Sequence, residues 1–382
     1  MRLVTLFPLH TLTDFLLAIP GFSIHVKVFN LPSTSLYCKM HRALLVQEVV
    51  HLIMQSIRYD MEVFEPRGRK ALCSAALTCS GFLDAAMDAL WYNMTSLTPL
   101  FKLLSNFGLE YQEKVCHVLS PIRDFLNIVQ HHVLLGPILE SDLKRFNAYA
   151  FRVRRYYCQW YGAGDDVDIS AYVHVLQASG RSHIFPRLLD LNIIEAYKDG
   201  ANTTKIMLLM SPCLHKFSMS GSSTSTAIIL NSLQITTPHI LCLTLRGVAF
   251  VDHYVSVICS LSQLQEISIF EDDRFEHKSG HRGEPALFDL SFFLRLSCKK
   301  TLQKFSLHWL YIVQSDSSIW TVEFPSLESI DFSITSIGPI ADFFCHVMAS
   351  KNYRLGLDHH LSANSLNLLR LNTGINSLTS LW

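Results

Sequence analysis

The sequence predicts a multidomain α+β protein, in which a three-helix module and a helical linker precede an α/β solenoid of short repeats. Two observations lead to this prediction. Apolar residues recur at helical spacing from position 40, and a short strand pattern recurs about every 25 residues from position 186. In addition, 49% of the residues are apolar and only 17% are charged, so a packed protein is expected rather than a disordered one.

The charge balance and the cysteines narrow the classes of function. The 32 basic and 32 acidic residues cancel. A nucleic-acid or anionic-membrane binder normally carries a basic excess, so neither partner is expected. The ten cysteines form no CxxC pair and no cluster with zinc spacing. Scattered thiols are typical of a reducing compartment, so we expect a cytoplasmic or nuclear protein that uses no metal and no cofactor.

Residues 1–39 begin like a secretory signal, with a basic residue and an apolar stretch, but a proline, a histidine and an aspartate interrupt the stretch. No uninterrupted apolar segment approaches the ~20 residues needed to cross a bilayer. We expect residues 1–39 to be a poorly ordered extension, or no part of the working protein, and Met40 to be the natural start. The alternative is a secreted repeat receptor, which would be glycosylated at Asn93 and Asn202.

Three short helices are expected in the module at residues 40–93. The first, LLVQEVVHLIMQSI, carries an apolar stripe at helical spacing, which predicts a core-facing surface. The stripe consists of Leu45, Val49, Leu52, Ile53 and Ile57. Pro66 and Gly68 break any helix before the second one, ALCSAALTC, and Ser80 can cap the third, GFLDAAMDALWYN. Three such helices bury little area alone, so they are expected to share an apolar surface with a partner or an adjoining domain.

The motifs of this module carry a family resemblance. The run Ala76-Leu77-Thr78-Cys79-Ser80-Gly81-Phe82 and the pair Leu90-Trp91 follow an opening segment at 44–50. In these three places the segment resembles an F-box, in the version common in fungal F-box proteins. It departs from the family pattern in two ways. Gln47 stands where proline is usual, and the loop at 58–70 is longer than the typical one.

The resemblance implies a partner and a contact surface. F-box helices dock to the small adaptor subunit of an SCF-type, cullin-RING ubiquitin ligase. The residues that would make this contact are Leu45, Val49, Leu52, Ile53, Leu77, Phe82 and Trp91.

The region at 94–180 also resembles the linker of these proteins, and its own pattern predicts a helix. Leu143, Phe146, Tyr149, Ala150 and Val153 form an apolar stripe. The arginines at 145, 152, 154 and 155 would then lie on the solvated side. The alternative is a basic-aromatic patch for nucleic acid at 152–157, which the zero net charge disfavours.

From position 181 to 382 the pattern apolar-x-x-apolar-x-apolar recurs in six clear copies. They are Leu188/Leu191/Ile193, Leu214/Phe217/Met219, Ile240/Leu243/Leu245, Leu264/Ile267/Ile269, Leu302/Phe305/Leu307 and Leu327/Ile330/Phe332, with a weaker seventh at Leu366/Leu369/Leu371. Helix-like stretches, STAIILNSL, VDHYVSVICSL, PALFDLSFFLRL and GPIADFFCHVMA, lie between strands. The period falls in the range of leucine-rich repeats, and the region resembles the irregular repeats of F-box proteins. A curved solenoid with parallel strands on its concave side is expected.

Alternation along each strand predicts which side chains a target protein would meet, because successive side chains point to opposite faces. The polar outward positions that we assign to target binding are Asp190, Asn192, Lys216, Ser218, Thr244, Arg246, Glu266, Ser268, Lys304, His308 and Asp331. The alternative is that these positions are polar only because the face is exposed to solvent, without any role in binding. The insertion at 271–285 is either a binding loop or a solvated spacer.

Signatures of catalysis are absent from the sequence. It has no G-x-S-x-G elbow, no phosphate-binding GKS or GKT loop and no G-x-G-x-x-G. Asp165, Asp166 and Asp168 are read as a solvated turn with a helix cap, with a cation site as the alternative. The adjacent pairs at 131–132 and 359–360 are His-His, and neighbouring side chains diverge too far to chelate one ion.

The sequence therefore predicts a non-catalytic subunit that holds a target protein near the ubiquitin-carrying enzyme. A repeat scaffold without any ligase role is the second hypothesis, and the secreted receptor is the third. The target itself cannot be read from the outward residues of a solenoid, since these follow no transferable code.

Overall fold

The structure is a computed structural model of the 382-residue chain. It describes residues 46–59, 66–78, 80–115, 126–159, 167–194, 201–220, 223–247, 252–270, 287–288, 295–308, 311–312, 322–333, 347–349 and 354–357. The chain divides into two compact units. The first comprises residues 1–156 and 163–185, and the second comprises residues 157–162 and 186–382.

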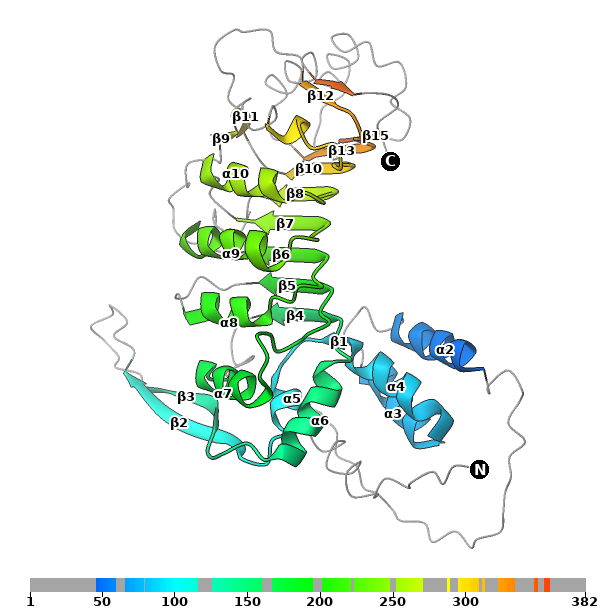
Figure 1. Ribbon diagram of the computed structural model, residues 1–382, viewed down its shortest axis with the longest axis vertical. Helices are drawn as coiled ribbons and strands as arrows, with labels where there is room; N and C mark the ends of the chain where they lie inside the picture. Colours follow the sequence, from blue (N-terminus) through cyan, green and yellow to red (C-terminus); the bar gives the residue numbers. More distant parts are fainter. Residues whose placement is uncertain are drawn as a thin grey trace, which may run out of the picture. The chain divides into compact units, whose positions relative to one another are not determined.

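The fold is mixed α/β, as the sequence predicts, with a parallel sheet whose described strands do not close into a barrel (Figure 1). In the described part of the chain, no helix combines the length and the apolar content that a membrane span requires. Residues 1–39, with the predicted extension, lie outside the described residues.

The first unit begins with three helices: α2 (Gln47–Tyr59), α3 (Pro66–Thr78) and α4 (Ser80–Tyr92). Helix α4 packs against both α2 and α3. Pro66 stands at a helix boundary, as the first residue of α3, whereas the expectation that Gly68 breaks the helix was wrong, because Gly68 lies inside α3. Proline fits the first turn of a helix, where its missing N–H has no partner to lose. The connection between α2 and α3 is therefore 60–65, shorter than the long loop expected at 58–70.

The rest of the first unit contains more strand than the predicted helical linker. It holds β1 (Asn93–Met94), α5 (Thr98–Phe101), β2 (Phe107–Val115), β3 (Leu126–Leu134), α6 (Glu140–Ala150) and α7 (Ile169–Ser179). Strands β2 and β3 form an antiparallel pair in which Phe107 faces Leu134. Helix α6 ends at Ala150 rather than continuing past Val153. Arg155, the last of the four arginines, is instead the first residue of β4 (Arg155–Gln159). The first two residues of β4 pair with β1 in parallel.

The second unit is built on a parallel sheet with strands in the order β5-β6-β7-β8-β10-β13-β15. These are β5 (Asp190–Ile194), β6 (Lys216–Ser220), β7 (Cys242–Arg246), β8 (Glu266–Phe270), β10 (Lys304–His308), β13 (Ser329–Ser333) and β15 (Arg354–Leu357). Helices α8 (Ala201–Leu209), α9 (Ser223–Thr236) and α10 (Asp252–Ser260) connect the first strands. The first six strands are the ones that the apolar pattern predicts.

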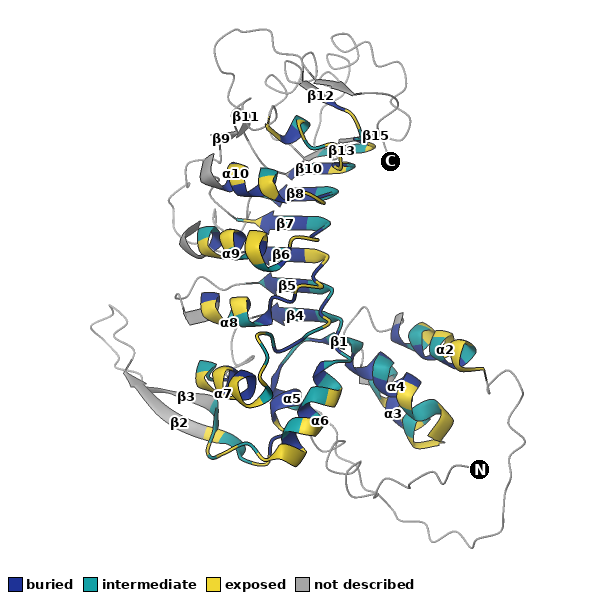
Figure 2. Cartoon of the chain, in the orientation of Figure 1, coloured by how far each residue is buried: buried dark blue, intermediate teal, exposed yellow. Residues whose placement is uncertain are grey.

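The apolar positions of the pattern form the core of this unit. Every described side chain among the eighteen positions is buried, with exposed fractions from 0% to 4% (Figure 2). Ile330 and Phe332 lie in β13, but their burial is not described. The alternation of buried and half-buried residues along β5 and β7 confirms the predicted direction of the side chains.

The entry to each strand repeats the same hydrogen bonds. The carbonyl of Leu189 accepts from two successive amides, those of His215 and Lys216, both at 2.9 Å. The carbonyls of residues 215, 241, 265 and 303 accept two amides of the following strand in the same way. A turn precedes these entries, with Leu214 N–H donating to the Ser211 carbonyl at 3.0 Å and Pro212 at the turn's second position, where proline presets the backbone. Residues at equivalent positions therefore make the same backbone hydrogen bonds in successive copies of the pattern.

The later copies depart from the prediction. The stretch PALFDLSFFLRL contains β9 (Leu287–Phe288), which pairs with β11 (Tyr311–Ile312). The stretch GPIADFFCHVMA ends in β14 (Val347–Ala349), which pairs with β12 (Val322–Phe324). The helix expectation was wrong at 287–288 and 347–349, because short apolar runs fit a buried strand as well as a helix. Arg295 and Leu296, which end the first stretch, are helical as expected. The sheet's last described strand is β15, and the predicted copy at 366–371 lies outside the described residues.

Candidate partner-binding surfaces

The buried face of α2 differs from the predicted one. Val50, Met54 and Arg58 are buried, with exposed fractions of 2%, 3% and 5%. The predicted core positions Leu52 and Ile53 are exposed instead. The helix carries apolar side chains on several sides, so the pattern alone allowed two faces. Arg58 was not recognisable as a core position, because its guanidinium is buried over the ring of Tyr92, 3.6 Å from the ring centroid.

The exposed apolar side chains of the module form its candidate adaptor surface. Leu52 is 65% exposed, Leu77 is 53% exposed and Ile53 is 39% exposed. Val46, just before α2, is 45% exposed and was not among the predicted contact residues. Val49 and Phe82 are half-buried, and Leu45 lies outside the described residues. Large apolar side chains in water are costly, so these exposed positions of α2 and α3 are candidates for contact with another protein.

Trp91 has a different role from the predicted adaptor contact. It is only 4% exposed, and its ring stacks on that of Tyr149 in α6 with 4.9 Å between the centroids. The assignment of Trp91 to adaptor binding is therefore corrected. Its large apolar surface packs α4 against α6, so a partner cannot reach it without rearrangement.

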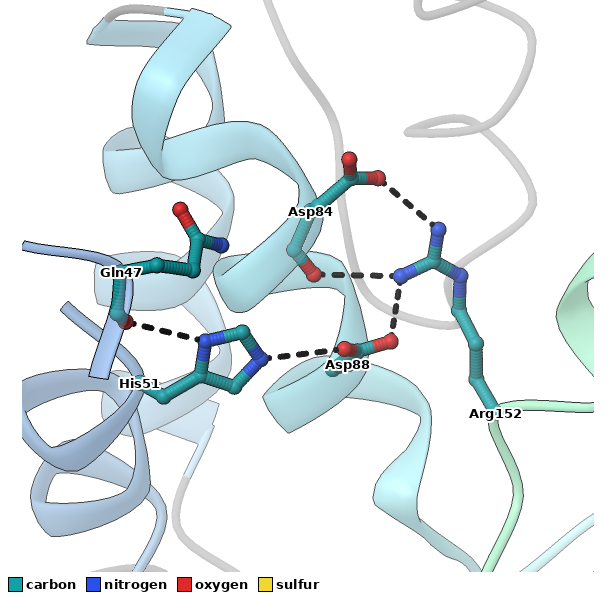
Figure 3. Close-up of polar contacts among 5 residues, drawn as sticks. All are labelled: Gln47, His51, Asp84, Asp88 and Arg152. Atoms are coloured by element: carbon teal, nitrogen blue, oxygen red, sulfur yellow. Dashed lines mark hydrogen bonds and ion pairs between the residues drawn. The ribbon is translucent and has the colours of Figure 1, made fainter.

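A polar cluster links α2, α4 and Arg152, two residues after the end of α6 (Figure 3). The ring of His51 contacts the Gln47 carbonyl through Nδ1 at 3.2 Å and Asp88 Oδ2 through Nε2 at 3.3 Å. Arg152 pairs with Asp88 Oδ1 and, at 3.0 Å, with Asp84 Oδ1; it also donates to the Asp84 carbonyl at 3.1 Å. The cluster fixes the module to the rest of the first unit.

The predicted basic face of the linker is not a row of solvated arginines. Arg152 is held by the acidic residues of α4, and Arg145 pairs with the buried Asp142 at 2.7 Å. The guanidinium of Arg155 lies 5.7 Å from the centre of the Tyr92 ring. Sequence reasoning missed these contacts, since the partners of Arg152 lie 64 and 68 residues away. Arg145, Arg152 and Arg155 therefore contact other side chains of the first unit.

The outward positions of the sheet come together in rows, because the strands are in register. The central row runs Asn192, Ser218, Thr244, Ser268, Ser306 and Asp331. A flanking row at the strand entries runs Asp190, Lys216, Cys242, Glu266, Lys304 and Ser329. A third row at the strand ends includes Ser220, Arg246, Phe270 and His308. The predicted target-binding residues therefore share one face of the sheet.

Exposure differs among these rows. Lys216, Arg246 and Lys304 are exposed, whereas most of the central row is half-buried. Ser268 is only 8% exposed, so its assignment to target contact is corrected. Glu266 and Phe270 lie two positions before and after Ser268, on the same face of the strand. The side-chain exposure of His308 is not described.

Side chains on this face interact with their neighbours on the next strand. The Cys242 thiol donates to Glu266 Oε2 at 3.5 Å, and burial and then the Glu266 carboxylate raise the pKa of Cys242 to about 11. The thiol therefore stays protonated near neutral pH. The Arg246 guanidinium lies 4.7 Å from the centre of the Phe270 ring. The face offers exposed cations beside a carboxylate, which suits a protein ligand of mixed charge.

The remaining candidate sites carry structural roles where they are described. The Asp168 side chain accepts from the Ser170 amide at 2.8 Å and caps α7, which confirms the predicted helix cap. The ring of His132 stacks on Phe107 with 5.3 Å between centroids. Among the described residues, no group of His, Cys, Asp and Glu is arranged to hold a metal ion. Asp165, Asp166, the pair at 359–360 and the insertion at 271–285 lie outside the described residues.

No protein-family model matches the chain, and no curated protein matches it either. Any function must therefore be argued from the two surfaces above.

Proposed function

We propose that this chain is the substrate-recognition subunit of an SCF-type ubiquitin ligase. In this proposal, the F-box-like module at 40–93 docks to the ligase adaptor, and a leucine-rich-repeat solenoid at 181–382 binds a target protein. The chain itself performs no chemistry. It raises the rate of ubiquitin transfer by holding the target close to the ubiquitin-carrying enzyme.

The observation that carries the proposal is the exposed apolar surface of Leu52, Ile53 and Leu77, with exposed fractions of 65%, 39% and 53%. These residues belong to the helices whose motifs resemble an F-box, and all three were expected to contact the adaptor. Covering one such side chain contributes roughly 1.5–3 kcal/mol, so three of them supply a substantial share of a stable interface.

The second unit supports the other half of the proposal. Its strand entries repeat the same hydrogen bonds at residues 189, 215, 241, 265 and 303, as expected for stacked repeats. The outward rows present Lys216, Glu266 and Lys304 on neighbouring strands of one rigid sheet. Side chains held on strands keep a fixed spacing, which favours selective binding over unspecific contact.

Affinity purification from cells tests the proposal. The full chain should bring down the adaptor and the cullin. The double variant Leu52→Asp/Ile53→Asp should lose both while still folding, because these side chains are exposed. The matched control is Ile235→Asp in α9, where the side chain is 80% exposed and lies outside the module. An adaptor signal that is equal in all three proteins contradicts the proposal.

One observation favours a second candidate, a repeat scaffold without a ligase role. Trp91, an anchor implied by the F-box resemblance, is buried against Tyr149 and is not free for an adaptor. In that case the purified complexes contain other proteins but no adaptor, and deletion of residues 40–93 leaves them unchanged.

A further inference from the structure

Three exposed cations lie on the outward face of the sheet, each on a different strand. They are Lys216 in β6, Arg246 in β7 and Lys304 in β10. Among the described residues, none of the three forms an ion pair. The guanidinium of Arg246 is held over the ring of Phe270, which orients it but carries no opposite charge. The positive charge of these side chains is therefore available to a ligand.

The acidic side chains of the same face are less accessible than the cations. Asp190, Glu266 and Asp331 are all half-buried. Glu266 accepts from the Cys242 thiol at 3.5 Å, and Asp190 and Asp331 also interact with other groups of the chain. The face thus carries both signs of charge, but the charges that project into solvent are basic.

The strand register sets the spacing of the three cations. Lys216 and Lys304 belong to the same row, with two strands between them, and neighbouring strands are about 4.8 Å apart. The Cα atoms of the two lysines are therefore about 14 Å apart. Arg246 follows Cys242 of that row by four residues along its strand, so its Cα lies at a similar distance, about 14–16 Å, from each lysine. A chain with several spaced anionic groups can meet all three cations at once.

We propose that the part of the target protein that binds this face is an acidic segment, whose separate Asp or Glu carboxylates pair with Lys216, Arg246 and Lys304. An extended chain advances about 3.3 Å per residue, so carboxylates about four residues apart match the spacing of the two lysines. The half-buried hydroxyls of Ser218 and Thr244 lie between the lysine row and Arg246, where they can hydrogen-bond to the backbone of the segment. This inference rests on the target-binding half of the proposed function and not on the adaptor contact.

Fluorescence anisotropy of labelled peptides with the purified full-length chain tests the inference. The probe is a glycine-serine peptide with a glutamate at about every fourth position, and the matched probe carries glutamine instead. We expect the glutamate probe to bind, the glutamine probe to bind at least about tenfold more weakly, and added salt to weaken the binding of the glutamate probe. Equal binding of the two probes, or no binding of either, overturns the proposal.

Charge variants locate the binding on the sheet. Lys216→Gln/Arg246→Gln/Lys304→Gln should weaken the binding of the glutamate probe at least about tenfold, because three charge pairs are lost. The matched control Lys300→Gln removes an exposed lysine from the turn before β10 and should leave the affinity unchanged. The reversal Lys216→Glu/Lys304→Glu should bind a lysine version of the probe in preference to the glutamate version, a result that misfolding cannot produce. Wild-type affinity in the triple variant, or an unchanged preference in the reversed variant, overturns the proposal.

Two further probes separate carboxylates from phosphate groups. They are the same peptide with phosphoserine in place of glutamate, and a single-stranded oligonucleotide of similar length. We expect neither to bind much more tightly than the glutamate probe, because each cation stands alone and matches a singly charged group. Binding of either that is more than about tenfold tighter assigns the face to phosphate and overturns the proposal.

The peptide assay contains no adaptor, so its outcome is independent of the ligase role. If the glutamate probe does not bind while the adaptor co-purifies with the chain from cells, this inference alone fails. If the probe binds and no adaptor co-purifies, the ligase role alone fails.

Discussion

The helical module and the strand repeats bury their apolar residues in different ways. In the repeats, every described position of the apolar pattern is buried. In the module, α2 buries Val50 and Met54 but leaves Leu52 and Ile53 in solvent. A repeat covers its apolar face with the next copy of itself, so its sequence alone determines what is buried. The face that a short helix buries depends on distant elements, and any remaining apolar surface is available to a partner.

Truncation of a repeat core residue should have the largest effect. Phe217 in β6 is 1% exposed, so Phe217→Ala should lower the free energy of unfolding by about 3–5 kcal/mol. Chemical denaturation of the full chain measures this loss. The control Ser218→Ala, at the next position on the outward face, should change it by less than about 0.5 kcal/mol. Equal losses of unfolding free energy in the two variants would contradict the assignment of Phe217 to the buried face and Ser218 to the outward face.

Removal of a buried charge in the first unit should have the next largest effect. Asp142 accepts from the amide and hydroxyl of Ser105 at 2.9 and 2.6 Å and pairs with Arg145 at 2.7 Å. Asp142→Asn should cost about 1–3 kcal/mol of stability, because the amide replaces an acceptor with a donor. Denaturation at neutral pH measures the cost, with the exposed Glu140→Gln as the control.

The same carboxylate predicts a pH dependence. Burial alone would raise the pKa of Asp142, but the hydrogen bonds from Ser105 and the Arg145 charge outweigh it and hold the pKa below the ordinary 3.8. The stabilisation is therefore complete above about pH 4 and is lost as the pH falls through the lowered value. Wild type should lose more stability than Asp142→Asn below pH 4. Parallel acid curves for the two proteins would contradict this assignment.

The polar cluster at Arg152 should contribute less, because its partners are partly exposed. The side chains of Asp84 and Asp88 are 76% and 45% exposed. Arg152→Met keeps the side-chain stem and should cost about 1 kcal/mol, and the cost should shrink as salt screens the charges. Unfolding at low and high ionic strength measures both. A cost that does not depend on salt would indicate packing rather than ion pairing.

The smallest effect is expected on the outward face of the sheet. Removing the stacking of Arg246 on Phe270 by Arg246→Ala should cost about 0.5–1 kcal/mol of stability. A double-mutant cycle with Phe270→Leu isolates the pairwise contribution. A coupling above about 2 kcal/mol would show that this face stabilises the fold rather than serving a ligand.

The strands of the second unit could be predicted because their pattern is local. Leu191 and Ile193 are two residues apart, both are buried, and the same spacing recurs in the following copies. The later connections could not be predicted in the same way. The apolar segment Val347–Ala349 is compatible with a helix or a strand by its sequence. It forms a strand that pairs with Val322–Phe324, and this distant partner has no signature in the local sequence.

The module shows where sequence reasoning fails for physical reasons. Arg58 is buried only because Tyr92, 34 residues further along the chain, provides an aromatic face for its guanidinium. Trp91 is buried because α6 brings Tyr149 to it. Neither contact has a local signature, so both the core stripe of α2 and the role of Trp91 were assigned incorrectly. Leu52, Ile53 and Leu77, in contrast, were assigned to a partner and are exposed.

The most direct measurement is the affinity of the purified chain for the purified ligase adaptor. Wild type should bind, and Leu52→Asp/Ile53→Asp should weaken binding by at least about 100-fold, since two apolar contacts become charged. Ile235→Asp should bind like wild type. If the wild-type chain shows no affinity for the adaptor, or if the double variant binds as tightly as wild type, the exposed apolar side chains of α2 are not an adaptor surface.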